Sequence, residues 1–173
     1  MRQEVAAIRA QTTKPYNVNF FCHAPPEVDA RRETVWRHAL SPYFIEYGID
    51  PNAILAGPGR SPFSNAAADG LEEFKPAVVS FHFGLPAPEL LERVRRSGAK
   101  ILSSATTVDE ALQLEARGVD AIIAQGLEAG GHRGIFLSED LSTQVGTFAL
   151  VPQIVRAVKI PVIGIGGITS GID

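Results

Sequence analysis

The chain has 173 residues, of which 45% are hydrophobic and 20% are charged, as is typical of one soluble globular domain with a real core. Its formal net charge is −3 without any long basic run, which disfavours nucleic-acid binding. Apolar runs are short and broken by Gly or Pro, so no membrane span is predicted, and the lone cysteine, Cys22, fits a reducing cytoplasm.

Helix and strand signals alternate along the chain, which predicts an α/β fold with a parallel sheet. Residues 50–70 are rich in Gly, Pro, Ser, Asn and Ala, and we expect them to form a long irregular connection. The predicted strands are 16–22, 77–83, 100–103, 120–124 and 160–165, and the predicted helices are 2–11, 29–40, 89–96, 106–114 and 147–158. The middle strands recur about every 20 residues, a spacing that suits units of a (β/α)8 barrel.

The segment from Gln125 to Gly134 follows a predicted buried strand and holds four glycines around His132. Glycine lets the main chain adopt positive φ and lets a ligand approach closely, and histidine exchanges a proton near neutral pH. The pattern therefore favours a loop that wraps a planar or anionic ligand and aims an imidazole at it. The alternative is a flexible surface turn with a stray histidine.

A second glycine pair, Gly166-Gly167, follows the last predicted strand. Free backbone N–H groups after a late barrel strand commonly cradle phosphate. Asn19, His82 and the segment 103–107 also lie in or after predicted strands, where barrel active sites are built. We therefore expect these polar and glycine residues to meet at one end of the sheet.

Five ordered segments together resemble the nitronate monooxygenases, formerly called 2-nitropropane dioxygenases. They cover nearly the whole chain: Asn17–Phe21, Pro76–Pro86, Ala99–Thr107, Ala124–Gly134 and Ile160–Ile168. The resemblance implies an FMN-dependent TIM barrel that oxidises alkyl nitronates and nitroalkanes with dioxygen. The order and spacing of the five segments make this a specific match.

Carried over from the family, His132 would be the catalytic base that removes the proton α to the nitro group. The resemblance also implies an FMN site formed by Asn19, Gln125, Gly130 and Gly167, with help from the backbone N–H groups of Gly131 and Gly166. The residues by themselves supply only the physical fit: an imidazole for proton transfer and open backbone for a phosphorylated cofactor.

Other residues allow two interpretations each. His82 could line the substrate pocket or be a satisfied core histidine. Glu128 could support the glycine-rich loop or face solvent, and Lys100 could reach a flavin edge. Cys22 suits a small strand-end residue better than a nucleophile, and no set of His, Cys and carboxylate residues has metal-ligand spacing.

A closed barrel of this type needs eight strands, and the sequence predicts five. We expect residues 1–173 to be a single partial TIM-barrel domain that corresponds to family strands three to seven. The strands at 16–22 and 160–165 would then be open edges. The expected consequences are weak FMN binding and self-association through these edges.

Two alternatives remain open from the sequence. One is an FMN-dependent enoyl-acyl-carrier-protein reductase, which shares the Glu-Ala-Gly-Gly-His loop and the glycine pair. The histidine in the segment 80–84 favours the nitronate enzyme. The other alternative is a non-catalytic remnant that acts as an association module, and the missing strands motivate it.

Overall fold

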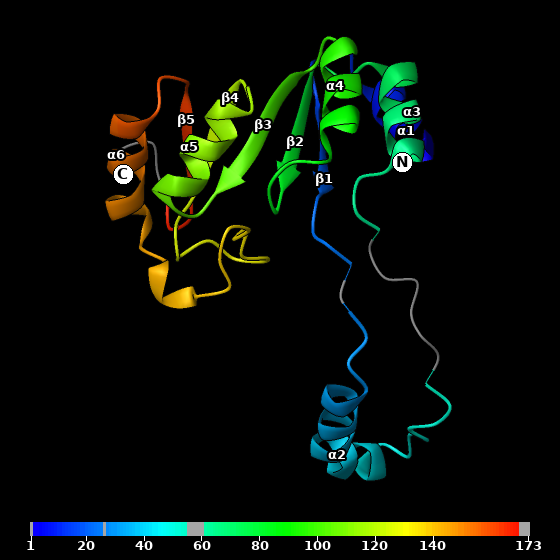
Figure 1. Cartoon of the computed structure of the whole chain (residues 1–173). Coiled ribbons are helices and arrows are strands. Elements are labelled where there is room, and N and C mark those ends of the chain that lie inside the picture. The colour runs from blue at the N-terminus through cyan, green and yellow to red at the C-terminus, as the bar shows by residue number, and fades with distance from the viewer. Residues whose placement is uncertain (1, 26, 55–60, 170–173) are drawn as a thin grey trace. The chain divides into compact units, whose positions relative to one another are not determined.

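The computed structural model describes residues 2–25, 27–54 and 61–169. Its centre is a parallel sheet with the strand order β1-β2-β3-β4-β5 (Figure 1). The strands are β1 (Asn17–Phe21), β2 (Val78–His82), β3 (Lys100–Ala105), β4 (Ala121–Gln125) and β5 (Val162–Ile165). A strictly sequential order, with a helix before each new strand, is the winding of a barrel sector, because a doubly wound sheet reverses its order. The predicted α/β fold of barrel type is confirmed.

The helices are α1 (Arg2–Gln11), α2 (Ala30–Glu46), α3 (Asn65–Phe74), α4 (Pro88–Arg96), α5 (Val108–Ala116) and α6 (Thr147–Ala157), with a short 3₁₀ turn, η1, at Leu141–Thr143. The predicted irregular connection over 50–70 is wrong from residue 65 onward, where α3 begins. Alanines in this stretch form a helix whose Ala68 and Leu71 are buried. Residues 55–60 of that prediction lie outside the described residues.

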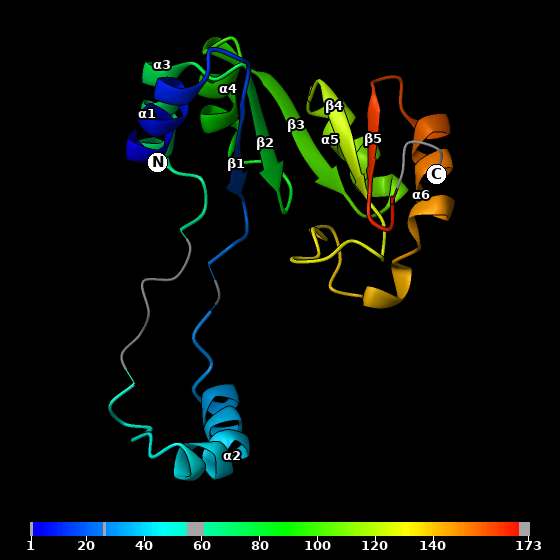
Figure 2. The ribbon, with the colours of Figure 1, turned by 180° about the vertical axis from the view of Figure 1, so that it is seen from behind.

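The core lies between one face of the sheet and the helices that connect its strands. Alternate side chains such as Val79, Phe81, Ile101 and Ile122 are almost completely buried there. The opposite face is more open, and Ile163 in β5 is 44% exposed. In both ribbon views α4 lies beside β2 and β3, and α6 lies beside β5 (Figure 2).

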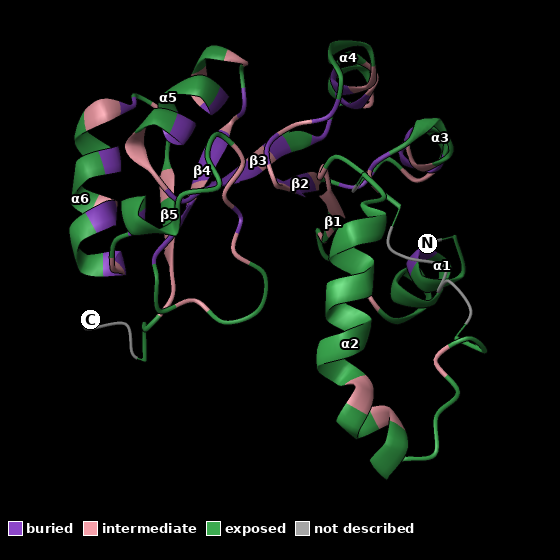
Figure 3. Ribbon diagram, turned by 60° about the horizontal axis from the view of Figure 1, so that its bottom comes forward, coloured by how far each residue is buried: buried purple, intermediate pink, exposed green. Residues whose placement is uncertain are grey.

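The burial pattern follows the strand order. Buried residues concentrate in β2, β3 and β4 and on the sheet-facing sides of α5 and α6 (Figure 3). Within the described residues, β1 and β5 each pair with one neighbour, so the expectation that these two strands form the edges is confirmed.

Residue contacts divide the chain into two compact units, one of residues 1–23 and 62–173 and one of residues 24–61. The second unit contains α2, whose predicted cap is confirmed: the Asp29 carboxylate accepts hydrogen bonds from the N–H groups of Arg31 and Arg32. None of the 17 residues of α2 is buried. In the part of the chain that the structure describes, no helix has the length and apolar character needed to cross a bilayer.

Candidate active site

The predicted site residues, apart from Asn19 in the middle of its strand, lie at the carboxyl end of the sheet or just beyond it. Asn19 is in β1, His82 ends β2, and Gln125 ends β4. The loop with His132 starts directly after Gln125, and Gly166-Gly167 follows β5. Because the strands are parallel, these strand ends share one edge, where (β/α)8 barrels place their active sites.

Gly126 lets the loop leave β4 beside the start of α6. A Cβ on Gly126 would stand 1.9 Å from Oγ1 of Thr147 and 2.5 Å from its Cα, so no larger residue fits without a shift of the backbone. The Arg133 guanidinium donates hydrogen bonds to the carbonyl oxygens of Gln125, Gly126 and Leu127 at 3.3, 2.8 and 2.8 Å. The loop is therefore folded back onto the end of its own strand.

Gln125 holds the far part of the loop. Its Nε2 donates to the carbonyl oxygen of His132 at 2.8 Å, and its Oε1 accepts from the N–H of Gly134 at 2.7 Å. Its side chain is 3% exposed. Both the nitrogen and the oxygen of this amide are bonded to the loop. Gln125 therefore has a structural role in the loop, in addition to the contact with a flavin that the sequence predicted.

His82 is half-buried, and both of its ring nitrogens have partners. Nδ1 lies 2.9 Å from Ser104 Oγ, and Nε2 lies 3.1 Å from the carbonyl oxygen of His132. Burial lowers the pKa of His82, which favours the neutral ring. Of the two interpretations of His82, the satisfied histidine matches these contacts, although its partner belongs to the candidate site.

The imidazole of His132 is exposed beside aromatic rings. Its ring centre lies 5.0 Å from that of Phe21 and 6.1 Å from that of Phe83. Neither of its ring nitrogens has a hydrogen-bond partner among the described residues. Phe83 has a φ of 66°, which is rare for an aromatic residue and is typical of functional sites. The arrangement provides an imidazole free for proton transfer next to an apolar wall.

The glycine pair after β5 packs against the start of the His132 loop. Gly166 and Gly167 have φ values of 108° and 68°. A Cβ on Gly166 would lie 2.7 Å from the backbone nitrogen of Ala129. Thr147 connects the two segments: its Oγ1 lies 2.8 Å from the Gly166 carbonyl oxygen and 2.9 Å from Glu128 Oε2, and its single hydroxyl hydrogen is shared between these two acceptors. The two glycine-rich segments that the sequence singled out are thus direct neighbours.

Glu128 does more than face solvent, which was one of its two interpretations. Its Oε2 accepts hydrogen bonds from the Thr147 N–H at 2.7 Å and from Thr147 Oγ1 at 2.9 Å, at the first turn of α6. These bonds, the backbone one first, hold the pKa of Glu128 below its usual value. The carboxylate therefore supports the loop, in agreement with the other interpretation.

Open backbone at this edge fits a phosphorylated ligand such as FMN. A Cβ on Gly130 or Gly131 would meet nothing within 4 Å, so a ligand can approach the main chain there. The N–H groups of Gly166 and Gly167 donate no hydrogen bond to another described residue. Asn19 is exposed in the middle of β1, and its Oδ1 accepts from Ser80 Oγ in the neighbouring strand at 2.8 Å.

Two further candidates have other roles. Lys100 starts β3 at the opposite end of the strand and donates from Nζ to Asp120 Oδ1 at 2.7 Å, so its suggested contact with a flavin is not supported. Burial raises the pKa of Cys22 to about 12, which suits the structural interpretation of this thiol. Among the described residues no cluster of His, Cys, Asp and Glu could hold a metal ion.

Glu110 is the supporting residue that sequence reasoning missed. It is fully buried, and its Oε2 accepts from the N–H and Oγ1 of Thr106 at 2.6 and 2.7 Å. Its Oε1 accepts from the N–H groups of Phe136 and Leu137 at 2.7 and 3.2 Å. The Thr107-x-x-Glu110 spacing is a capping signal, but it does not indicate that the carboxylate also ties down a distant loop.

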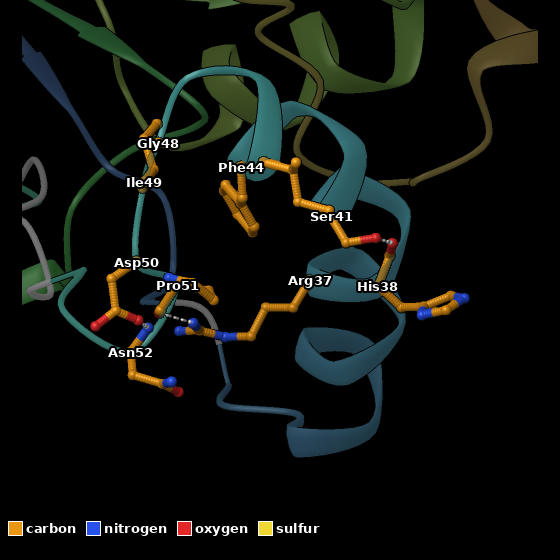
Figure 4. Close-up of a pocket in the computed structure, with 10 residues that line it drawn as sticks. Arg37, His38, Ser41, Phe44, Gly48, Ile49, Asp50, Pro51 and Asn52 are labelled. Carbon is orange, nitrogen blue, oxygen red and sulfur yellow. Dashed lines mark hydrogen bonds between the residues drawn. The ribbon is translucent and has the colours of Figure 1, made fainter.

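A separate groove of about 550 Å³ lies in the unit of residues 24–61 (Figure 4). It is bordered by α2 and the segment 48–52, and Arg37 crosses it to donate to the Pro51 carbonyl at 2.5 Å. None of the predicted site residues lines this groove. It is therefore distinct from the candidate active site.

Comparisons with known proteins agree on one family. The family model described as nitronate monooxygenase matches residues 1–173. The chain is 46% identical over 172 residues to a nitronate monooxygenase of Paraburkholderia phytofirmans and 41% identical over 171 residues to one of Pseudomonas aeruginosa. These alignments cover 98% of the chain but 47% and 49% of the two relatives. The chain thus spans about half the length of these relatives.

Two solved structures are similar to this chain over nearly its whole length. Nitroalkane oxidase from Streptomyces ansochromogenes has a TM-score of 0.80 and 39% identity, over 97% of this chain and 48% of that one. FabK from Thermotoga maritima is less similar, with a TM-score of 0.63 and 27% identity over 99% of this chain and 40% of that one.

Proposed function

Because the chain belongs to the nitronate monooxygenase family, we propose that it carries the base and part of the cofactor site of an FMN-dependent enzyme that oxidises alkyl nitronates and nitroalkanes with dioxygen. The observation that supports this most is the packing of the Gly166-Gly167 turn against the loop of His132. Both segments are at the carboxyl end of the sheet, which suits one shared ligand.

Each residue has a role in this proposal. His132 takes the proton from the carbon next to the nitro group, since within the described parts of the chain its imidazole nitrogens make no hydrogen bond that would occupy them. The backbone N–H groups of Gly130, Gly131, Gly166 and Gly167 bind the phosphorylated cofactor. When bound, FMN supplies the redox chemistry.

Four other side chains complete the proposed site. Asn19 and Gln125 orient the flavin, and Gln125 does so partly through the loop that it holds. Phe21 and Phe83 form an apolar wall on one side of the His132 imidazole.

The test compares His132→Asn with the unchanged sequence. We expect turnover of neutral nitroalkanes to fall by about 10²- to 10⁴-fold, with a much smaller loss for preformed nitronates, which need no base. Oxygen consumption measures both rates, and flavin absorbance checks that the cofactor is still bound. Equal loss on both substrate forms would assign His132 another task.

The choice of protein matters for this test. Since the chain spans about half the length of its relatives, we expect the 173-residue chain to hold FMN weakly by itself. The rates are therefore also measured in a chimera in which these residues replace the matching segment of the Paraburkholderia relative. A stoichiometric, tightly held flavin in the chain alone would contradict the expectation of weak binding.

An enoyl-acyl-carrier-protein reductase is the second enzyme to test. Identity of 39% to a nitroalkane oxidase, against 27% to FabK, favours the nitronate reaction. A reductase would oxidise a reduced nicotinamide cofactor in the presence of an enoyl thioester, whereas the proposed enzyme consumes oxygen with a nitronate. The two activities are read in separate assays of the same protein.

We also propose self-association through the open edges of β1 and β5. Exposed edge strands present unpaired N–H and C=O groups, and Ile163 adds exposed apolar surface on β5. Size-exclusion chromatography over a range of concentrations measures this, and a clean monomer would count against it. A cytoplasmic location is proposed from the single cysteine, which can form no internal disulfide.

A further inference from the structure

The structure assigns His82 a role as a positioning residue for the catalytic base: by donating from Nε2 to the carbonyl oxygen of His132, it fixes where the imidazole of His132 stands. The inference rests on the proposed function, because it takes His132 to be the base. His82 acts here through the main chain of another residue.

Two strands converge on one carbonyl oxygen. His82, the last residue of β2, and Gln125, the last residue of β4, place a nitrogen 3.1 and 2.8 Å from the oxygen of His132. A carbonyl oxygen has two lone pairs, so these two donors satisfy it completely. The peptide unit of His132 is thereby tied to two rigid elements of the sheet, which limits how far its exposed side chain can move.

Ser104 sets the tautomer that this role needs. Ser104 belongs to the neighbouring strand β3, and its Oγ lies 2.9 Å from Nδ1 of His82. When the hydroxyl donates to Nδ1, the ring carries its hydrogen on Nε2, which points to His132. The three groups form a line from β3 through β2 to the loop.

Gly134 shows that the loop is shaped around this arrangement. A Cβ on Gly134 would stand 2.7 Å from Cε1 of His82 and 3.0 Å from Oε1 of Gln125. Its N–H also donates to that Oε1 at 2.7 Å. Of the two residues that flank Arg133, His132 is therefore held by both His82 and Gln125, and Gly134 is held by Gln125 and packed against His82.

Two near-isosteric variants separate the two ring nitrogens. In His82→Gln the amide nitrogen takes the place of Nε2 and can still donate to His132. In His82→Asn the shorter amide takes the place of Nδ1, so the contact with Ser104 remains and the donor to His132 is lost. His38→Asn, in the exposed helix α2, is the matched control for loss of an imidazole.

The first readout needs neither cofactor nor turnover. Amide hydrogen exchange of Gly134, whose N–H is bonded to Gln125, reports how easily the loop opens in the 173-residue chain. If opening no longer breaks the bond from residue 82 to the His132 carbonyl, exchange should speed up by about 2- to 12-fold in His82→Asn and stay close to that of the unchanged chain in His82→Gln. Equal exchange rates in both variants and in the control would overturn the inference.

The second readout is the ratio of nitroalkane to nitronate turnover in the FMN-loaded chimera. We expect His82→Asn to lower this ratio about 10- to 100-fold, since misplacing a reacting group by 1 Å can cost about 10²-fold, and His82→Gln to restore most of it. A loss that is the same in both variants would overturn the inference, because it would place His82 on the substrate or in the general stability of the fold.

His132→Asn keeps the two hypotheses apart. If that variant retains full nitroalkane turnover, the proposed base is wrong, while the exchange rates still decide whether His82 holds the loop. If it loses nitroalkane turnover and His82→Asn does not, the proposed function stands and the positioning role falls.

Discussion

Glu110→Gln should destabilise the protein although it changes one atom of a buried side chain. Each carboxylate oxygen of Glu110 accepts two hydrogen bonds, so a glutamine must turn its NH₂ toward donors in either orientation. The less costly orientation faces Thr106, because the Thr106 hydroxyl can rotate and accept while its backbone N–H cannot.

The magnitude follows from the groups left without partners. One buried N–H without an acceptor costs about 1–3 kcal/mol, and the remaining bonds lose the assistance of a charge, which gives a total of about 2–4 kcal/mol. For a chain of this size that corresponds to a fall in Tm of roughly 5–15 °C. Thermal and urea unfolding followed by circular dichroism measure the loss.

Asp109→Asn is the matched control. Asp109 lies in the same first turn of α5, is exposed, and loses the same charge near the helix N-terminus. Its cost should be only about 0.3–1 kcal/mol, the range of a helix-dipole effect. If Glu110→Gln were within about 0.5 kcal/mol of this control, the hydrogen bonds to Thr106, Phe136 and Leu137 would not hold the loop as argued.

Three further predictions concern the supports of the site. Gly126→Ala should prevent stable folding, because its Cβ would stand 1.9 Å from Thr147 Oγ1. Gly130→Ala is the control: its Cβ would meet nothing within 4 Å, so this variant should unfold close to the original midpoint. Equal unfolding midpoints in the two variants would contradict the reasoning. Hydrogen bonds lower the pKa of Glu128 from its ordinary 4.5, so its contribution to stability is present above that pH and is lost as the pH falls further. In a plot of the unfolding midpoint against pH, Glu128→Gln should therefore flatten the acid side. An unchanged slope on the acid side would refute this. Cys22, with its pKa raised to about 12, should react with a thiol reagent at pH 8 only after unfolding, and prompt reaction in the folded chain would show that it is accessible as a thiolate.

Most of the fold could be predicted because buried parallel strands are apolar runs and glycines mark the ends of helices and strands. Helix α3 was missed since its alanines are next to a stretch rich in Gly, Pro and Ser, where composition favours a loop. The glycines and His132 were found because each carries a local signal. The partners of Glu110 and His82 could not be found, since they are set by contacts between residues 26 and 50 positions apart.

The place where the unit of residues 24–61 joins the sheet has a consequence for protein engineering. The chain leaves the sheet unit after His23 and returns at Pro62, where the Phe63 N–H donates to the Phe21 carbonyl at 2.8 Å. The Phe63 ring packs 4.9 Å from Phe20 and 5.3 Å from Phe81. Because both ends of the segment 24–61 are held at β1, we expect that it can be shortened or exchanged at a modest entropic cost and that the register of β1 and β2 stays the same.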